Sequence, residues 1–354
     1  MDCDLLIAGQ GLAGTLLAWE AHWEGLRVVI VDPDEKDTAS KVAAGIINPI
    51  TGHRLTKSWR FDELHPAAID FYRRSGKDLG RFFYHERTIL RCLDDAESIG
   101  LWEKKSQREE YHQLFSYDRE SVRPADPDSF LPCASRFATR RCGNLDVPGF
   151  LAASREFFAL QHRVVTELVD LTAFHSDSSS ARCIRYRGIS ARHAVFCLGE
   201  NGACSRFFRK LPLKRAKGEV LEIEIPDSTE NRIVSRRGKW VLPAGNGRFL
   251  AGSTYSWDPE NRLPSEAGKN AILAGLRSTL REDPAILRHR SGIRPIVRGS
   301  RPVLGQHPDT PGVAIFNGLG SKGVLNGPHF ARTLIRNLIA DAPIEPDVDI
   351  RFFL

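Results

Sequence analysis

Residues 9–14, which read Gly-Gln-Gly-Leu-Ala-Gly, have the composition and spacing of a turn that binds phosphate groups. Gly9 allows a tight turn, Gly11 lets the backbone approach a pyrophosphate, and Gly14 lets a following helix lie close to a strand. The unpaired N–H groups and the positive dipole end of that helix would stabilise the phosphates. Residues 9–14 therefore predict a dinucleotide-binding turn.

The sequence around this turn supports the same prediction. Strand-like segments at 5–8 and 27–31 lie on either side of the expected helix, and Asp32 directly follows the second segment. In dinucleotide-binding folds an acidic residue about 20 positions beyond the glycines binds ribose hydroxyls. A glycine-rich turn without a ligand is the alternative, but the strand, the helix, the second strand and the acid all agree with a bound dinucleotide.

The composition is that of a globular protein with more than one domain. The chain has 354 residues, of which 42% are hydrophobic and 27% charged, and its length exceeds the usual single-domain range. No run approaches the ~18 apolar residues that span a bilayer, and the first strand begins too early for a signal peptide. We expect a cytoplasmic protein with no membrane span.

The seven cysteines do not form a recognisable framework. Their number is odd, they are scattered, and no C-x-x-C pair occurs, which disfavours both a disulfide framework and a zinc site. We expect reduced thiols and no bound metal. The cysteines are Cys3, Cys92, Cys133, Cys142, Cys183, Cys197 and Cys204.

The charge balance leaves two classes of ligand open. The formal net charge is +6 and the isoelectric point is about 9.0, which suits either an anionic cofactor and substrate or a nucleic-acid surface. Basic residues concentrate in segments 206–217 and 281–301. A solvated basic face without a ligand is an equally good interpretation of such segments.

Beyond Asp32 the sequence departs from the regular strand and helix alternation of an NAD-dependent dehydrogenase. Residues 37–59 are rich in small residues, and 219–225 alternate charged and apolar residues, which predicts a half-exposed antiparallel strand. The other expected elements are a helix at 65–79, a strand at 84–93, a charged helix at 94–108, a strand from 142 leading into a helix at 150–160, short strands at 163–168 and 194–199, a hairpin at 240–252, a helix at 266–280, a strand at 312–316 and a C-terminal helix at 330–340.

These elements predict an α/β fold with a discontinuous, Rossmann-like nucleotide-binding domain. We expect this domain to comprise residues 1–80, 142–215 and 290–354. An inserted substrate domain of the α+β type, built on an antiparallel sheet, would comprise residues 81–141 and 216–289.

The order of these pieces resembles the D-amino-acid oxidase superfamily of flavoproteins, which includes glycine oxidase, sarcosine oxidase and D-amino-acid dehydrogenases. The resemblance extends over nearly the whole chain, and its motifs are specific for the superfamily in their order and spacing. The matching motifs are the glycine turn with Asp32, the small-residue loop 39–45, the strand 195–199, the segment 291–295 and the turn 318–323.

This resemblance implies a bound FAD. Only Gly and Ala let the backbone pass within van der Waals distance of the planar flavin ring, and the segments around Ala44 and Gly320 supply them. Amides at 320–323 would stabilise the charge of the reduced ring with help from Lys322, for which a solvent-facing lysine is the alternative. The FAD-binding residues carried over are Gly9, Gly11, Leu12, Ala13, Gly14, Asp32, Pro33, Ser40, Lys41, Ala44, Gly45, Val165, Gly199, Arg294, Gly320, Ser321, Lys322, Gly323 and Val324.

Covalent attachment of the flavin is not expected. Relatives attach it in two places, but segment 40–45 contains no histidine here and segment 294–305 contains no cysteine. The resemblance therefore implies non-covalent FAD.

The resemblance also implies that the substrate is a small amine or amino acid, which loses a hydride from carbon to give an imine. The cofactor supplies this chemistry and the protein orients the C–H bond, so no catalytic triad or carboxylate pair is required. Arg294 matches the arginine that binds the substrate carboxylate in the glycine oxidase branch, a role that suits a guanidinium group. An ion pair between domains is the alternative for Arg294.

The resemblance also implies a pocket wall that contains Trp240, Tyr255 and Trp257. Aromatic residues at such positions belong to the hydrophobic core as often as to a pocket.

Two departures from the relatives bear on the reaction. Ser321 stands where glycine oxidase has a second arginine, so the carboxylate would be bound more weakly or in another arrangement. Residues 249–251 lack the lysine that speeds reaction with oxygen in sarcosine oxidases. The electron acceptor stays open between oxygen and a quinone or another protein.

Other functions remain as secondary hypotheses. Residues 318–323 also resemble a turn in the oxidase domain of the bifunctional enzyme that modifies wobble uridine in tRNA, and a basic chain would suit an RNA substrate. An electron-carrier flavoprotein without a small-molecule substrate, and an NAD-dependent dehydrogenase, are the remaining alternatives.

Overall fold

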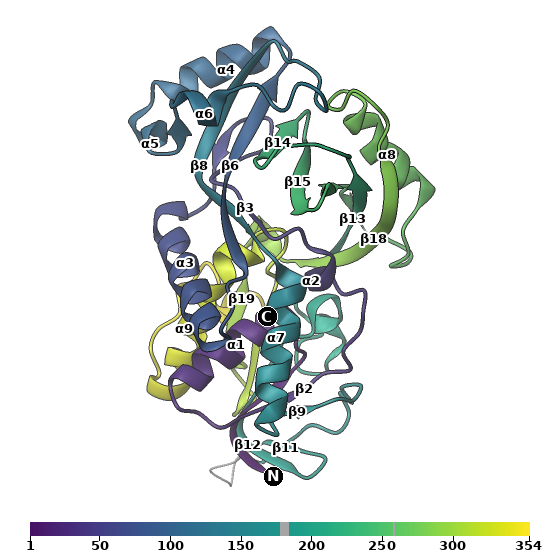
Figure 1. Cartoon of the computed structure of the whole chain (residues 1–354). Coiled ribbons are helices and arrows are strands. Elements are labelled where there is room, and N and C mark those ends of the chain that lie inside the picture. Colours follow the sequence, from purple (N-terminus) through teal and green to yellow (C-terminus); the bar gives the residue numbers. More distant parts are fainter. Residues whose placement is uncertain (178–183, 258) are drawn as a thin grey trace.

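The computed structural model describes residues 1–177, 184–257 and 259–354, and for Arg298 the backbone alone. Two large sheets form the two parts of the molecule seen in Figure 1. The first sheet lies in the lower part with helices α1, α3, α7 and α9, and the second lies in the upper part with α4 and α8. The fold is thus mixed α/β, as predicted.

The first sheet contains the parallel strands expected of a nucleotide-binding fold. β1 lies between β12 and β2, and all three are parallel. Leu5 and Ile7 belong to one hydrophobic cluster while Leu6 and Ala8 belong to another, because alternate side chains of β1 face opposite sides of a covered sheet. The described strands are β10 (His175–Ser176), β11 (Ile184–Tyr186), β12 (Ile189–Phe196), β1 (Asp2–Ala8), β2 (Val28–Val31) and β9 (Val164–Val165) in pairing order, with β20 (Val313–Asn317) on β12 and β19 (Val303–Gln306) on β20.

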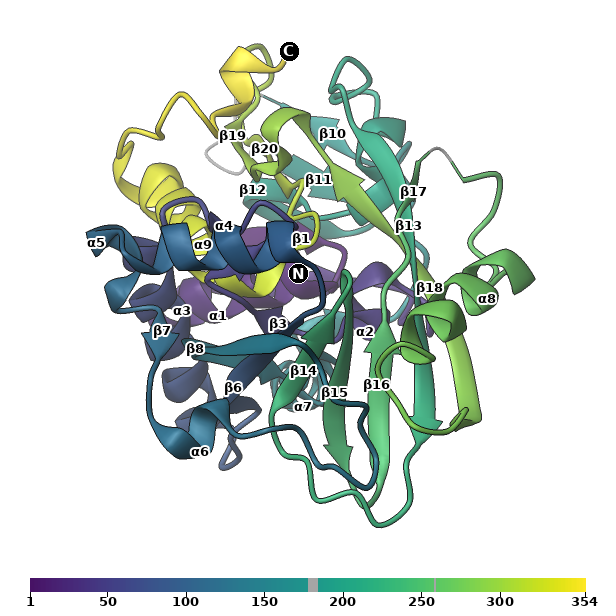
Figure 2. The same cartoon turned by 90° about the horizontal axis from the view of Figure 1, so that it is seen from above.

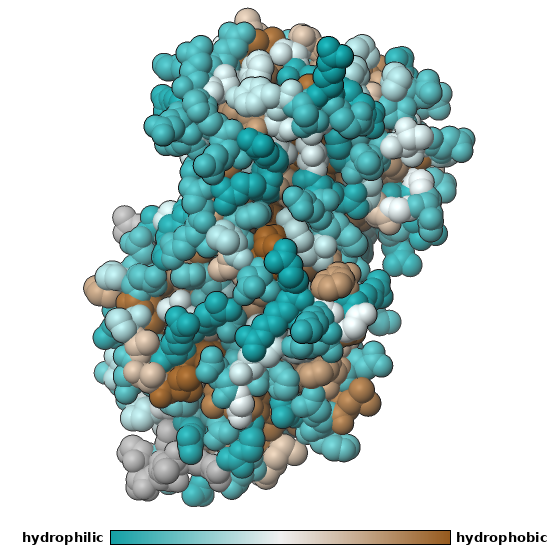
Figure 3. All heavy atoms as spheres, turned by 60° about the vertical axis from the view of Figure 1, so that its left-hand side comes forward, coloured by the Kyte–Doolittle hydropathy of each residue, from teal (hydrophilic) through white to brown (hydrophobic). Residues whose placement is uncertain are grey.

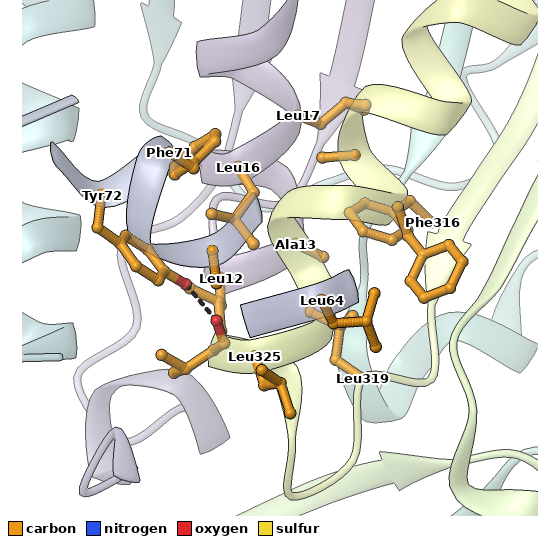
Figure 4. Packing of buried hydrophobic residues seen from close by; sticks show 14 of the residues in the cluster. Leu12, Ala13, Leu16, Leu17, Leu64, Phe71, Tyr72, Phe316, Leu319 and Leu325 are labelled. Atoms are coloured by element: carbon orange, nitrogen blue, oxygen red, sulfur yellow. Dashed lines mark hydrogen bonds between the residues drawn. The ribbon is translucent and has the colours of Figure 1, made fainter. Parts of the chain in front are cut away.

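Helices from distant parts of the sequence pack together on one face of this sheet. Figure 4 shows Leu16 of α1 near Tyr72 of α3, with α9 beside them. The Tyr72 hydroxyl donates to the main-chain carbonyl of Val324 at 2.9 Å, and Trp19 Nε1 donates to Ser154 Oγ at 2.9 Å. The described helices are α1 (Leu12–Trp23), α2 (Ala39–Val42), α3 (Phe61–Asp78), α4 (Ala96–Ser106), α5 (Glu109–His112), α6 (Arg119–Val122), α7 (Val147–Leu160), α8 (Glu266–Leu276) and α9 (Gly323–Ala340), with short 3-10 helices η1 (Gly199–Cys204), η2 (Arg298–Ser300) and η3 (Ile350–Phe352).

The second sheet is mainly antiparallel and joins two blocks of sequence. β6 and β14 pair in parallel, which connects strands before residue 146 with strands after residue 213. Figure 2 shows β14, β15 and β16 side by side and α8 beside β18. The described strands are β17 (Ser256–Trp257), β13 (Lys214–Glu224), β16 (Arg248–Gly252), β15 (Lys239–Gly245), β14 (Ile233–Arg236), β6 (Tyr84–Leu93), β8 (Ser135–Leu145) and β3 (Ile46–Ile47) in pairing order, with β18 (Ala285–Ile296) on β13 and β7 (Phe115–Ser116) on β8; β4 (Ile50–Thr51) and β5 (Thr56–Lys57) form a separate pair.

The expectation of a half-exposed antiparallel strand at 219–225 is confirmed toward the end of β13, where Glu224 is exposed, but it is wrong at Glu219. In β13 the side chain of Glu219 is only 2% exposed, because the start of α8 covers it: a Cβ on Gly268 would lie 2.3 Å from the Glu219 carboxyl carbon. The buried carboxylate is stabilised by Ser265 and Lys217. Alternating charge therefore indicated the strand correctly but not the burial of Glu219.

Most other predicted elements are confirmed, with shifted ends. The hairpin is formed by the antiparallel strands β15 and β16, and the strand from 142 is part of β8, which leads into α7. α3 begins at Phe61, before the predicted start, and α8 ends at Leu276, before the predicted end. The strand predicted at 163–168 is limited to β9.

The surface drawn in Figure 3 is mostly hydrophilic, with apolar residues in small separate groups. None of the described helices combines the length and the apolar character needed to cross a bilayer.

Candidate active site

A cleft with a volume of about 470 Å³ lies at the carboxyl ends of the parallel strands. Its walls come from both sheets, at the junction where α2 lies beside β18 (Figure 1). Most residues predicted to bind the cofactor line this cleft. They are Gly9, Gly11, Leu12, Ala13, Asp32, Pro33, Ser40, Ala44, Gly45, Gly199, Arg294, Gly320, Ser321, Gly323 and Val324.

The glycine turn has the close contacts that its sequence predicts. Gly9 has a φ of +99°, and a Cβ there would lie 2.6 Å from the Cys197 carbonyl oxygen. A Cβ on Gly14 would lie 1.9 Å from the Gly9 carbonyl oxygen, so α1 approaches the turn closely only because Gly14 has no side chain. Gly11 precedes α1 without a side-chain cap, while Ser40 Oγ accepts from Leu12 N at 3.0 Å. The helix start therefore presents N–H groups to the cleft, as an anion site requires.

The carboxylate of Asp32 is held in a fixed orientation at the end of β2. It accepts from the backbone N–H groups of Gln10 at 2.6 Å and Asp34 at 2.8 Å. Arg155 of α7 contacts it at 3.4 Å and also donates to the Gln10 side-chain oxygen at 2.6 Å. Sequence reasoning missed Arg155, because its distance of more than 100 residues from Asp32 leaves no local pattern.

Four predicted residues do not line the cleft. Gly14 packs beneath the turn, and Lys41 Nζ donates to Asp34 at 2.6 Å and to the Glu35 carbonyl at 2.8 Å, so it holds the loop after β2. The Val165 carbonyl accepts from Asp32 N at 3.1 Å. Lys322 precedes α9 and is half-buried, and this burial lowers the pKa of its ammonium group. The roles predicted for Lys41, Val165 and Lys322 in FAD binding stay predictions.

The cleft wall continues into segments that the sequence did not single out. Leu168, Val169 and Leu171 line it beyond Asp32, and Glu35, Glu200 and Arg262 form a charged group at its edge. None of these residues belongs to one of the predicted motifs, so only the folded chain brings them to the cleft.

A second set of small residues lies at the other end of the cleft. Gly45 has a φ of +71°, and a Cβ there would lie 2.0 Å from the Leu145 carbonyl oxygen. A Cβ on Gly292 would lie 2.7 Å from Ala39 Cα. Gly323 and Val324 begin α9 and line the cleft with no side-chain cap at the helix start. The cleft thus has a helix N-terminus at each of two places along its wall, which fits a long anionic dinucleotide.

Arg294 projects from β18 into the cleft wall without a carboxylate partner. Its guanidinium is 3.4 Å from the Thr254 carbonyl and 3.5 Å from Ser253 Oγ, and lies 5.4 Å from the centre of the Tyr255 ring. Among the described residues no carboxylate forms an ion pair with it. Burial lowers the pKa of Arg294. A largely buried guanidinium with only two long hydrogen bonds keeps N–H donors that an anion in the cleft could accept from.

Aromatic residues form the wall near Arg294. Trp240 and Tyr255 line the cleft, whereas Trp257 does not. The Trp240 ring lies against Gly252, where a Cβ would be 2.9 Å away. Burial raises the pKa of Tyr255, so its hydroxyl stays neutral at physiological pH.

Comparisons with known proteins agree with this geometry. A glycine oxidase from Bacillus licheniformis is 24% identical, covering 97% of this chain and 95% of that protein. The tRNA 5-methylaminomethyl-2-thiouridine biosynthesis bifunctional protein MnmC from Marinobacter nauticus is 28% identical, covering 93% of this chain and 54% of that protein. The crystal structure of glycine oxidase from Bacillus cereus has the same fold, with a TM-score of 0.81, 17% identity and 96% coverage of both chains.

The family comparison decides between NAD and FAD as the cofactor. The model of the family described as FAD dependent oxidoreductase (DAO) matches residues 4–336. This match includes the glycine turn, both sheets and most of α9, and it sets aside the NAD-dependent dehydrogenase alternative. The chain belongs to the family of FAD-dependent oxidoreductases.

Proposed function

We propose that this FAD-dependent oxidoreductase oxidises the C–N bond of a small amine or amino acid that carries a carboxylate, giving an imine. The observation that carries this proposal is the desolvated guanidinium of Arg294, which faces the cleft with only two long hydrogen bonds. An anionic group of the ligand would supply the partner that Arg294 lacks. The glycine oxidase relative supports an amino acid as that ligand.

The residues of the cleft fit FAD. The α1 start around Gly11 would bind the pyrophosphate, Asp32 the ribose, and the segment around Gly45 and Gly320 the flavin ring. FAD bound there would accept the hydride that leaves the substrate carbon. We further propose that the FAD is bound non-covalently.

Arg294 would orient the substrate by its carboxylate. A guanidinium presents two parallel N–H donors, so bidentate binding fixes both the position and the rotation of the carboxylate. Trp240 and Tyr255 would cover the neighbouring part of the substrate and exclude water from it. Orientation of one C–H bond, rather than acid or base catalysis by the protein, is the contribution that these residues would make.

The charges of the cleft favour a neutral amine. Among the described lining residues the acidic ones are Asp32, Glu35 and Glu200. Asp32 accepts two backbone hydrogen bonds, and the two glutamates form ion pairs with Arg262. No described carboxylate of the wall is therefore left to stabilise an ammonium ion, which suits oxidation, since the substrate nitrogen must lose its proton before the imine forms. Hydrolysis of the released imine needs only water.

Anaerobic reduction of the protein-bound flavin tests this proposal. Glycine, sarcosine, proline and a panel of D-amino acids are each added without oxygen, and the flavin absorbance is followed. Bleaching by at least one carboxylated amine is expected, and failure of the whole panel would contradict the proposal. Turnover with oxygen and with an artificial quinone in parallel identifies the acceptor, which we propose to be either oxygen or a quinone or protein.

An amine attached to tRNA is a second candidate substrate. The MnmC relative is 28% identical over most of this chain, and this chain spans about half of it. Outside the cleft wall, the exposed Trp257 ring lies 5.1 Å from the ring of Tyr255, which lines the cleft, and Lys214 lies 6.0 Å from the Trp257 ring. Exposed aromatic rings beside cations suit unstacked bases. A steep fall of tRNA affinity with salt would support this candidate, whereas absent binding would reject it.

A further inference from the structure

Arg262, in a loop next to the second sheet, forms ion pairs across the cofactor cleft. We call residues 259–265 the strap; it runs between β17 and α8, and its Arg262 lines the cleft. Arg262 Nη1 lies 2.8 Å from Glu35 Oε2, and Arg262 Nε lies 2.5 Å from Glu200 Oε1. Both glutamates also line the cleft. The strap is thus bound to the wall opposite its own sheet.

The two glutamates stand on either side of the dinucleotide-binding turn. Glu35 follows β2 and Glu200 follows β12, and these two strands flank β1 in the sheet. β1 itself leads into Gly9. Arg262 therefore bridges the segment after β2 and the segment after β12. These segments lie on opposite sides of the turn after β1, where a pyrophosphate would bind.

The C-terminal end of the strap is fixed by the buried carboxylate of Glu219. Glu219 accepts from Ser265 N at 2.9 Å and from Ser265 Oγ at 2.7 Å, and Lys217 Nζ donates to the Leu263 carbonyl at 2.8 Å. The Ser291 hydroxyl donates to the Arg262 carbonyl. Because the backbone from Arg262 to Ser265 is anchored, the Arg262 side chain is held over the cleft rather than free to swing into solvent.

We propose that Arg262 retains the cofactor: its ion pairs to Glu35 and Glu200 hold the strap across bound FAD, and FAD is released only after these ion pairs have broken. The side chains of Arg262 and Glu35 are 37% and 44% exposed, so salt reaches this pair and weakens it. The proposal rests on the FAD cleft and is independent of which substrate is oxidised.

The rate of FAD release tests this role directly. The holoprotein is diluted into flavin-free buffer, so that rebinding is negligible, and release is followed by the rise of flavin fluorescence as FAD leaves the protein. Loss of two partly exposed ion pairs in Arg262→Ala should speed release about tenfold, with Arg262→Lys intermediate because it keeps the charge. The control is Arg277→Ala at the C-cap of α8, which removes the exposed ion pair to Asp283 and should leave release unchanged.

The dependence of the FAD release rate on salt gives a second test. Raising NaCl from about 0.05 to about 0.5 M should speed release several-fold in the wild type and much less in Arg262→Ala, because the screened pairs are already absent there. Glu35→Gln should also speed release. If Arg262→Ala does not fold, the FAD release rates of the wild type at increasing salt and of Glu35→Gln test the role of Arg262 instead.

The outcomes separate this proposal from the assignment of the cofactor. Release from Arg262→Ala within about twofold of the wild type would overturn the role of Arg262, and so would wild-type release that does not depend on salt. A wild-type protein that binds no flavin at all would instead contradict the FAD cleft itself.

Discussion

Arg155 lies 3.4 Å from the carboxylate of Asp32 and donates to the Asp32 main-chain carbonyl at 3.2 Å. It also donates to Thr166 Oγ1 at 2.7 Å, so α7 and the loop after β9 fix the end of β2 from the side. The ribose-binding carboxylate proposed for this cleft is thus positioned by a residue from a distant segment.

Replacement of Arg155 should weaken FAD binding without removing the fold. Arg155→Met keeps much of the apolar stem but loses the hydrogen bonds that orient Asp32, and charged hydrogen bonds of this kind contribute about 1.5–3 kcal/mol. We expect the Kd for FAD to rise by about tenfold or more. Titration of the apoprotein by flavin fluorescence measures it, with Arg277→Met as the exposed control; an unchanged Kd would show that Asp32 does not need Arg155.

Gly14→Ala should destabilise the protein and abolish flavin retention. The new methyl group would lie 1.9 Å from the Gly9 carbonyl oxygen, so α1 has to move away from the turn. The matched control is Gly100→Ala in α4, where a Cβ meets nothing within 4 Å and helix propensity predicts a gain of about 0.5–1 kcal/mol. Thermal unfolding with bound-flavin content checks both variants, and a Gly14→Ala variant as stable as the wild type would contradict the close approach.

Acid should destabilise the protein partly through Glu219. Burial opposes ionisation of this carboxyl, but the hydrogen bonds from Ser265 and the charge of Lys217 outweigh it and hold the pKa of Glu219 below its ordinary value of 4.5. A depressed pKa stabilises the folded state above the unfolded pKa, and this stability is lost as the pH falls through the folded value. The Tm of the wild type should therefore fall more steeply below pH 4.5 than that of Glu219→Gln. Parallel Tm curves for the two proteins would contradict this role.

Sequence reasoning succeeded where the signal is local. β1, α1 and β2 follow from an apolar strand, three glycines and a second apolar strand, all within 32 residues, and the structure confirms them. The order of the later motifs was sufficient to identify the family.

Sequence reasoning failed where the role of a residue depends on contacts between distant segments. The alternating charges of β13 predicted an exposed Glu219, because no pattern in the strand indicates that α8 covers it. Arg155, Glu200 and Arg262 stand in segments without a motif, and only the folded chain brings them to the cleft. Such residues are found by their partners in space rather than by their neighbours in sequence.

The most direct test of the proposed function compares carboxylated amines with the same amines lacking the carboxylate, in the wild type and in Arg294→Ala. Glycine with methylamine, sarcosine with dimethylamine and proline with pyrrolidine form suitable pairs, and the measurement is the second-order rate constant of anaerobic flavin reduction. Loss of a desolvated charge pair costs about 2–5 kcal/mol, so Arg294→Ala should lower this constant about a hundredfold or more for the carboxylated amine that the wild type oxidises, while the constant for its partner should change little. Equal effects on both members of the pair, or a wild type that does not prefer the carboxylated amine, would contradict the assignment of Arg294 as the carboxylate-binding residue.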